Sequence, residues 1–354
     1  MSPDKPAAQL PAPQIPAEGD QPASVLPALS SGAVAAGRRR APASLSAAAP
    51  WAVPLLLVLM FAFFSIAAPG TFWSAVNVRV MITGQATVLL LAIAVIIPLR
   101  AGVFDLSVSA VMILSGATYG VLTAAHWPAL PAALLCILIG PAAGLVNGLL
   151  VLAVGIDSFI ATLGTMTLMT GLATLVSGDN VVTTFPAGLT RLADAHFLGF
   201  TTPVWAGWIA ALALWYVFEW TPCGRYLLFI GGNTRAAQLA GLRVTAFRQG
   251  AFLASATLAS LTGLLSAGSL GSVDPSGGGA YLLPPITAAF LGASAIKLGR
   301  FNVAGTLIAI YLLAVGITGL QLLGLQGWIS DVFNGGCLIV AVGFAVLIRR
   351  PATK

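Results

Sequence analysis

The amino-acid sequence predicts an all-α fold, a polytopic membrane helix bundle of about ten transmembrane helices with both termini in the cytoplasm. The chain of 354 residues is 58% hydrophobic and 7% charged, whereas a soluble domain carries about 25% charged residues. From Trp51 onward, apolar stretches of about the 20 residues that cross a bilayer follow one another almost to the C-terminus. Basic residues gather in alternate breaks between these stretches, which indicates the sidedness of the bundle.

The first 50 residues differ in composition from the rest of the chain. They are rich in Pro, Ala and Ser and show no hydrophobic period, so residues 1–50 are predicted to form a disordered cytoplasmic tail. The arginines from Arg38 to Arg40 precede the apolar run 51–68, an order that also fits a signal peptide. We favour a first transmembrane helix, because these arginines lie far from Met1 and the run is long enough to cross.

Polar residues and Pro/Gly breaks divide the predicted transmembrane domain, residues 51–350, into apolar segments. The long breaks are 178–201, predicted to lie outside, and 220–248, predicted to lie inside. The other connections are short, as expected between antiparallel neighbours in a bundle. The predicted spans are 51–68, 83–99, 103–125, 130–154, 158–177, 202–219, 249–270, 284–298, 303–324 and 329–348.

The distribution of Lys and Arg predicts which breaks face the cytoplasm. With both termini inside, the outside breaks hold only Arg79 and Arg191. The opposite orientation would invert nearly every loop. The predicted inside positions hold Arg38, Arg39, Arg40, Arg100, Arg225, Arg235, Arg243, Arg248, Lys297, Arg300, Arg349, Arg350 and Lys354.

No catalytic, metal or cofactor site is predicted on this chain. Cys136, Cys223 and Cys337 lie far apart without ligand spacing, and the two histidines fall outside the predicted membrane core. None of the three lysines follows a glycine, so there is no Walker A loop, and an ATP-driven function needs a nucleotide site on another chain. The basic residues lie at helix ends rather than on one face, which argues against nucleic acid as a partner.

Polar residues at one junction between apolar stretches are candidates for a solute pathway. Asp105, followed by Ser107 and Ser109, lies where an uncompensated carboxylate is costly and is therefore usually paired or functional. Arg100, earlier in the same junction, is a possible partner. The alternative is an interfacial acid that caps the third helix with the help of Ser107.

The fourth and fifth spans add a packing motif and further polar residues. Gly140, Gly144 and Gly148 recur at every fourth position, which favours the close approach of another helix. Asn147 needs a hydrogen-bond partner in the membrane, so it either joins helices or lines a polar path. Thr162 offers a hydroxyl for a hydrated route, although threonine in such helices often bonds its own backbone.

The long inside break contains a predicted short helix. Asn233 or Thr234 can cap it, Ala236 and Ala237 favour it, and Gly241 supplies a left-handed stop. A short helix of small residues on the inner face can enter a groove on a cytoplasmic partner. The alternative is an ordinary amphipathic connector.

Four motifs occur along the chain in an order typical of one transporter family. They are GVFDLSVS at 102–109, NGLL at 147–150 with FIATLG at 159–164, GRY at 224–226 and GGN at 231–233. In this order they resemble the ribose-type ABC transporter permease family, the inner-membrane component of binding-protein-dependent transport systems. The departures are Phe104, where the family usually has Ile, and Ser109, where Gly is common.

The resemblance implies a permease subunit that moves a sugar or sugar-like solute, such as a pentose, hexose or polyol, into the cytoplasm. The implied partners are a cytoplasmic ABC ATPase that binds the ATP, a periplasmic solute-binding protein and a second permease copy, in the lipid bilayer of the bacterial inner membrane. The second copy is identical (a homodimer) or different (a heterodimer). The candidate ATPase-coupling residues are Gly231, Gly232, Asn233, Arg235, Ala236, Ala237 and Gly241. The candidate translocation-path residues are Asp105, Ser107, Ser109, Asn147, Phe159 and Thr162.

Two alternative functions are open at this point. A branched-chain amino-acid or nucleoside ABC permease of the wider superfamily would share these features. An ion-coupled secondary transporter acting alone would carry ionisable residues in mid-span, whereas nearly all charges here fall at span ends.

Overall fold

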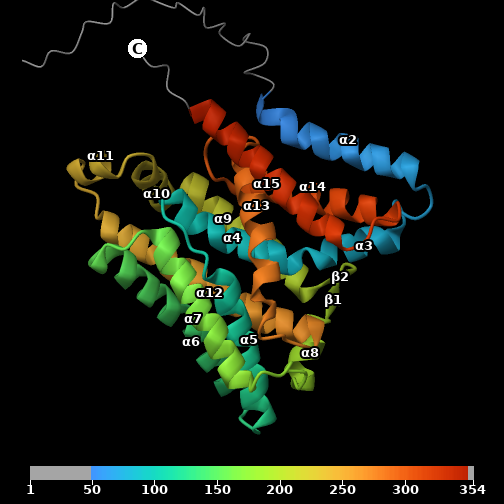
Figure 1. Cartoon of the computed structure of the whole chain (residues 1–354), viewed down its shortest axis with the longest axis horizontal. Helices are drawn as coiled ribbons and strands as arrows, with labels where there is room; N and C mark the ends of the chain where they lie inside the picture. Colours follow the sequence, from blue (N-terminus) through green and yellow to red (C-terminus); the bar gives the residue numbers. More distant parts are fainter. Residues whose placement is uncertain (1–48, 350–354) are drawn as a thin grey trace, which may run out of the picture. The chain divides into compact units, whose positions relative to one another are not determined.

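The computed structural model describes residues 49–349, and almost all regular structure in that range is helical (Figure 1). The predicted tail over 1–50 falls outside the described residues except for its last two. The helices are η1 (Ala49–Trp51), α2 (Ala52–Ala67), α3 (Ala75–Gly84), α4 (Ala86–Arg100), α5 (Val108–Ala124), α6 (Ala129–Gly148) with its π-helical extension η2 (Leu149–Val154), α7 (Ser158–Ser177), α8 (Ala187–Ala193), α9 (Thr202–Trp220), α10 (Pro222–Gly232), α11 (Thr234–Leu239), α12 (Val244–Leu270), η3 (Gly277–Tyr281), α13 (Leu283–Ala293), α14 (Val303–Leu322) and α15 (Trp328–Arg349).

Every predicted apolar span contains a helix, and the all-α class of the membrane bundle is confirmed. Five helical stretches within residues 49–349 are long and apolar enough to cross a bilayer by themselves, and three further apolar helices are shorter. The five are Ala75–Arg100, Ala129–Val154, Ser158–Ser177, Val244–Leu270 and Val303–Leu322.

The prediction of a span over 284–298 is wrong in length. Helix α13 has 11 residues, which cover about 17 Å at 1.5 Å per residue, whereas a bilayer core is about 30 Å thick. The cause is Asn302, whose side-chain nitrogen donates to the carbonyl oxygens of Gly292 (3.1 Å), Ala295 (3.2 Å) and Arg300 (3.0 Å). These bonds close a turn after α13, and Oδ1 of Asn302 then caps α14 by accepting from the backbone N–H of Gly305 at 2.7 Å.

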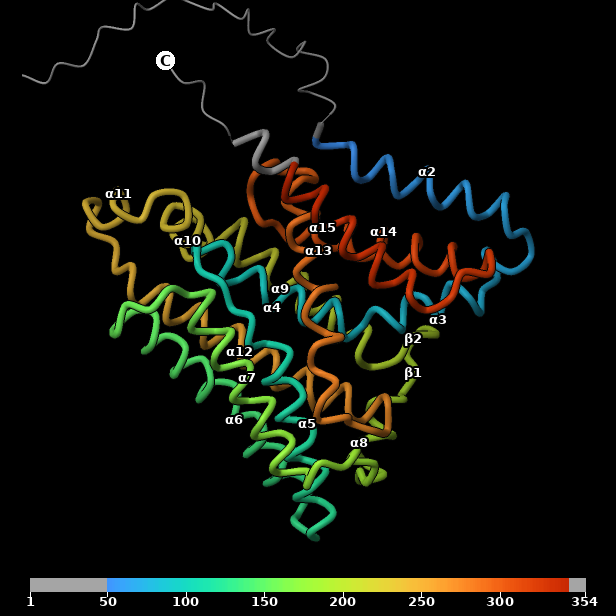
Figure 2. The backbone as a smooth tube through the Cα atoms, in the orientation of Figure 1, coloured from blue at the N-terminus to red at the C-terminus, as the bar shows by residue number. Residues whose placement is uncertain are grey.

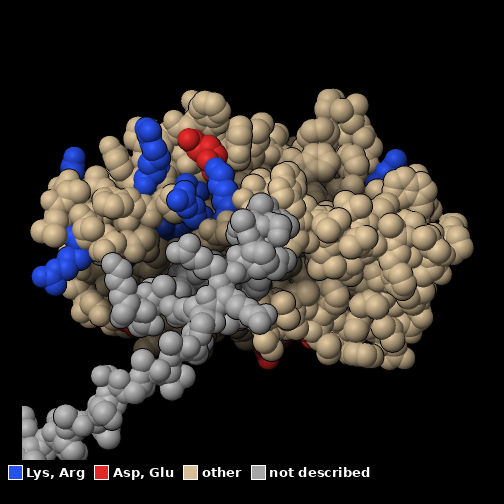
Figure 3. Space-filling view, turned by 90° about the horizontal axis from the view of Figure 1, so that it is seen from above, with Lys and Arg blue, Asp and Glu red and all other residues tan. Residues whose placement is uncertain are grey.

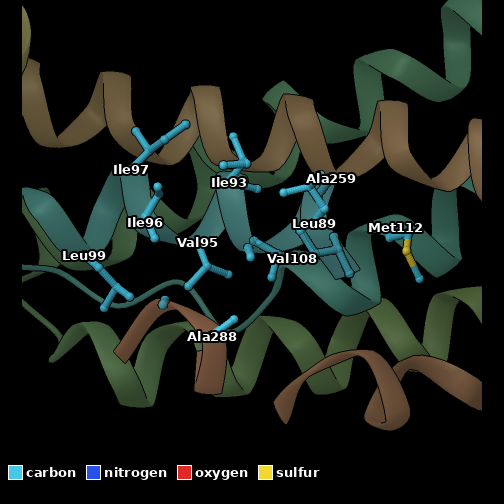
Figure 4. Close-up of a cluster of buried hydrophobic side chains, with 14 of the residues drawn as sticks. Leu89, Ile93, Val95, Ile96, Ile97, Leu99, Val108, Met112, Ala259 and Ala288 are labelled. Carbon is cyan, nitrogen blue, oxygen red and sulfur yellow. The ribbon is translucent and has the colours of Figure 1, made fainter. Parts of the chain in front are cut away.

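Helix α4 forms the centre of the hydrophobic core. All residues from Leu89 to Arg100 are buried, and α4 packs against α9, α12, α13 and α14. Figure 4 shows side chains of this helix, among them Leu89, Ile93 and Ile97, against Ala259 and Ala288 of neighbouring helices. Because lipid would also accept an all-apolar helix, it is the burial of these residues by neighbouring helices that places α4 at the middle of the bundle.

Glycines bring α6 and α12 into close contact, as predicted from their spacing. A Cβ atom on Gly140 would overlap the carbonyl oxygen of Ala256, and one on Gly144 would lie 2.6 Å from the carbonyl oxygen of Phe252. The side chain of Gln249 likewise occupies the space beside Gly148. Because lipid gives little hydrophobic drive for helix association, such backbone contacts supply much of the packing energy.

The segments predicted to form the outside loops pack together in the structure. Strands β1 (His196–Phe197) and β2 (Phe200–Thr201) form a hairpin, and a bridge joins Val182 to Val273. Figure 2 traces these segments beside α8. In the segment between α12 and η3, hydrogen bonds from the hydroxyl (2.7 Å) and the backbone N–H (2.9 Å) of Ser276 lower the pKa of the Asp274 carboxyl. This segment is thus bonded to the segment before α8 at Val273 and to itself at Asp274.

Candidate functional site

A short non-helical segment, residues 101–107, connects α4 to α5 inside the bundle. Gly102, its second residue, has a φ of 76°, a conformation that residues with a side chain rarely adopt. Ala101, Asp105 and Ser107 of the segment are buried. The prediction of a span starting at 103 is therefore wrong for the first five positions, because α5 starts only at Val108.

The predicted path residues Asp105, Ser107 and Asn147 meet in one buried hydrogen-bond network. Oδ1 of Asp105 accepts from the Ser107 hydroxyl at 2.6 Å and the Ser107 backbone N–H at 3.1 Å. Nδ2 of Asn147 donates to Ser107 Oγ at 2.8 Å and to Asp105 Oδ1 at 3.4 Å. Thr165 donates to Asn147 Oδ1 at 2.6 Å. The network joins the start of α5 to α6 and α7, so Asn147 connects helices, one of its two predicted roles.

Arg100 does not pair with Asp105, and that prediction is wrong. Its guanidinium donates to the carbonyl oxygens of Phe218 (3.1 Å), Gly224 (3.2 Å) and Phe301 (3.1 Å) and lies 4.2 Å from the centre of the Phe218 ring. These acceptors belong to the ends of α9 and α10 and to the turn before α14. Arg100 thus fixes the end of α4 to three other parts of the bundle.

Three buried side-chain oxygens near this network have no hydrogen-bond partner in the described structure. They are Oδ2 of Asp105 and the hydroxyls of Ser109 and Ser255. Ser109 is the second residue of α5, and Ser255 lies on α12, which packs along α5. Buried polar atoms are rarely left unpaired without a reason, and a site that binds polar groups is one such reason. Ser255 was not predicted, because a serine among small residues of a span carries no distinguishing signal.

The other two predicted path residues lie differently. The Thr162 hydroxyl donates to the carbonyl oxygen of Ser158 in its own helix at 2.7 Å, which is the local alternative considered from the sequence. Phe159 is half exposed, and its ring meets Phe104 edge-on with 6.2 Å between ring centres. Phe104 in turn stacks on Phe290 of α13 at 6.4 Å.

Phe104 lines a cavity that reaches the predicted coupling region. The cavity has a volume of about 380 Å³, and its wall includes Phe104, Phe290 and Phe301 together with Gly231 and Gly232 at the end of α10. Phe104, the neighbour of the candidate path residue Asp105, thus lines one cavity together with the candidate coupling residues Gly231 and Gly232.

The predicted short helix in the inside break is present as α11. Asn233 caps it, with Oδ1 accepting from the backbone N–H of Ala236 at 2.9 Å, and Gly241 follows with a φ of 79°. Ala237 is fully buried among Ile230 and Val244 of this chain. It therefore holds α11 in place, and its side chain is not available to a partner.

Residues of α11 that do face outward include Arg235 and Leu239. Leu239 is 85% exposed, more than any other large apolar residue described. Sequence reasoning missed it because the helix was identified by its small residues. A single exposed leucine is common on protein surfaces, but one at the tip of a protruding helix is suited to filling a pocket on a partner.

Basic side chains gather around α10 and α11. Figure 3 shows Lys and Arg grouped together with one acidic patch among them, and Lys297 forms an ion pair with Glu219 there. Arg79 lies elsewhere, next to the turn of the β1–β2 hairpin. The exposed basic residues of this group are Arg225, Arg235, Arg243, Lys297 and Arg300.

A bundle of apolar helices with an internal polar network, a cavity beside it and a short helix on a basic face has the architecture of a membrane permease component. The chain belongs to the family described as "Branched-chain amino acid transport system / permease component", whose model matches residues 77–342.

Curated relatives are named as sugar and signal-molecule permeases. The chain is 30% identical over 296 residues to the ribose import permease protein of Escherichia coli (strain K12), covering 81% of this chain and 91% of the relative. It is 28% identical to the D-allose transport system permease protein of the same strain (83% and 91% covered). It is also 28% identical to the autoinducer 2 import system permease protein of Photorhabdus temperata (85% and 92% covered). No solved structure matches the chain.

Proposed function

We propose that the chain is the membrane-spanning permease subunit of an ABC importer for a sugar or sugar-like solute. The observation that carries this function is the match along more than 80% of the chain to the ribose import permease. The family description names branched-chain amino acids, but the relatives reported above are named for ribose, D-allose and autoinducer 2. These names favour a polyhydroxylated solute over an amino acid or nucleoside.

The proposed partners are a cytoplasmic ABC ATPase, a periplasmic solute-binding protein and a second permease copy in a bacterial inner membrane. The names of the relatives support an importer, and the basic face around α10 and α11 supports a cytoplasmic location for that face by the positive-inside rule. The proposed topology has ten crossings with both termini inside. Helix α13 would complete its crossing with the help of η3, since α13 alone is too short.

The proposed topology predicts opposite labelling of Ala187 and Arg235, which are both exposed in the structure. In a chain whose native cysteines are replaced, Ala187→Cys should react with a membrane-impermeant thiol reagent in intact cells. Arg235→Cys should react only after permeabilisation, because it lies on the proposed cytoplasmic face. Fast labelling of Arg235→Cys in sealed cells would reverse the orientation.

The function is tested by reconstituting the permease with its ATPase and binding protein in vesicles. We expect uptake of D-ribose or D-allose that requires ATP and the binding protein and survives removal of ion gradients by ionophores. Uptake that needs an ion gradient but no ATP would instead identify an ion-coupled secondary transporter. ATP hydrolysis stimulated only by leucine or a nucleoside with the binding protein would identify one of the related permease types.

A further inference from the structure

We propose that the segment 101–107 links the coupling region mechanically to the solute path. In this proposal, the backbone contact between Gly102 and Gly231 transmits the movement of α10 and α11 to the segment. This inference rests on the proposed function, since it requires an ATPase that moves α10 and α11. It assigns a positioning role to Gly102 and Gly231, whose backbone contact involves neither ATP nor solute.

The contact between the two glycines joins backbone directly to backbone. A Cβ atom on Gly231 would overlap the carbonyl oxygen of Arg100 and lie 3.1 Å from the backbone nitrogen of Gly102. A Cβ atom on Gly102 would lie 3.0 Å from Cα of Gly231. Both glycines line the cavity, but their backbone atoms are in direct contact, with no side chain between them to absorb a displacement. A shift of the end of α10 therefore moves Gly102 rather than a flexible side chain.

Two arginines, Arg100 and Arg248, connect the backbone next to Gly102 with α10 and α11. Arg100, the last residue of α4 before the segment, donates to the carbonyl oxygen of Gly224 in α10. Arg248 of α12 donates to the carbonyl oxygen of Ala101 at 3.2 Å and to the hydroxyl of Thr234 in α11 at 2.8 Å. The start of the segment is thus held to both α10 and α11, so it cannot stay in place when these helices move.

The other half of the segment carries the groups that face the solute path. Phe104 forms part of the cavity wall opposite Phe290, and Asp105 holds the buried network with Ser107 and Asn147. A displacement that enters at Gly102 reaches Phe104 two residues later. The geometry therefore lets the ATPase move a ring at the cavity wall without rearranging the helices that surround it.

Two glycines provide a matched pair of variants for the test. A Cβ atom on Gly231 meets the segment, whereas one on Gly250 of α12, which belongs to neither candidate site, meets nothing within 4 Å. The readout is the labelling rate of Phe104→Cys by a thiol reagent, in a chain whose native cysteines are replaced by alanine. The permease is assembled with its ATPase in vesicles, with and without a non-hydrolysable ATP analogue, so no solute needs to be known.

We expect the nucleotide to change the labelling rate at least about fivefold in the parent complex and in Gly250→Ala, and less than about twofold in Gly231→Ala, as for other couplings between distant sites. Equal nucleotide responses of Gly231→Ala and Gly250→Ala would overturn the inference. Because Gly231→Ala also strains local packing, Thr234→Val is measured in parallel. It removes the bond from Arg248 without adding volume, and it should reduce the response. If Gly231→Ala does not accumulate, an unchanged response in Thr234→Val overturns the inference.

The same preparation separates this inference from the proposed function. A parent permease that neither binds an ABC ATPase nor responds to nucleotide would contradict the proposed function, and the inference would fall with it. A parent complex that shows ATP-driven uptake and a nucleotide response, while Gly231→Ala and Gly250→Ala respond alike, would contradict the inference alone.

Discussion

Replacing Leu239 by aspartate should abolish ATP-driven uptake and release the ATPase, while the permease stays in the membrane at its normal level. Leu239 is 85% exposed at the end of α11 and makes no contribution to the core of this chain. A residue that acts as a hot spot in an interface contributes about 2 kcal/mol or more to binding, and we expect Leu239 to act as one. A charge at that position would also have to be desolvated in the interface, so co-purification of the ATPase should fall by more than about 30-fold.

The matched control is Leu239→Met, which keeps an apolar side chain of similar volume and should retain most of the uptake. The measurements are membrane abundance by immunoblot, co-purified ATPase and uptake per permease molecule. Wild-type uptake and assembly in Leu239→Asp would show that the tip of α11 does not dock on the ATPase.

The burial of Ala237 changes what a bulky substitution at this position would test. A bulky residue at this position would test the partner interface only if the side chain faced outward. In the structure Ala237 is fully buried between α10 and α12, so Ala237→Trp would displace α11 from its own chain. The helix, its Asn233 cap and its Gly241 stop were predictable from local rules, but the side that faces the bundle depends on tertiary contacts.

The helices were largely predictable, because a long apolar run leaves the backbone few alternatives in a membrane. The errors occurred where side chains bond the backbone. At 103–107 the apolar pattern continues, but Gly102 turns the chain and the Ser107 hydroxyl donates to the Asp105 side chain, so these residues form no helix. After Ala293 the composition stays apolar, but the Asn302 side chain donates to three carbonyl oxygens and so closes a turn. Hydropathy does not contain this information.

The site was predictable in its residue types and not in its connections. Asp105, Ser107 and Asn147 were correctly selected as polar residues that need partners, and they are partners of one another. Pairing Asp105 with Arg100 was wrong because closeness in sequence is a weak guide once a turn intervenes. Arg100 bonds carbonyl oxygens more than 100 positions away. The contact of Gly102 with Gly231 has no sequence signal other than two glycines.

The buried network leads to the last prediction, that Asp105→Asn lowers uptake much more than it lowers membrane abundance. The amide keeps an oxygen in the place of Oδ1, which accepts from the Ser107 hydroxyl, the Ser107 backbone N–H and Asn147. The bonds that connect α5 to α6 therefore survive, and the abundance should stay within about twofold of wild type, as for other near-isosteric changes.

What the substitution removes is the carboxyl acceptor at Oδ2, which makes no hydrogen bond in the described structure although the Ser255 hydroxyl lies near the carboxyl group. A solute hydroxyl that donates to this oxygen would lose its acceptor, and leaving a buried donor without a partner costs about 1–3 kcal/mol. Uptake per molecule should then fall by at least about fivefold, since 1.4 kcal/mol corresponds to one factor of ten. Thr170→Val is the control, because the Thr170 hydroxyl bonds only the backbone of its own helix, at Met166, and its removal should leave uptake unchanged. Unchanged uptake per molecule in Asp105→Asn would reduce Asp105 to a structural cap of α5, with the solute passing elsewhere.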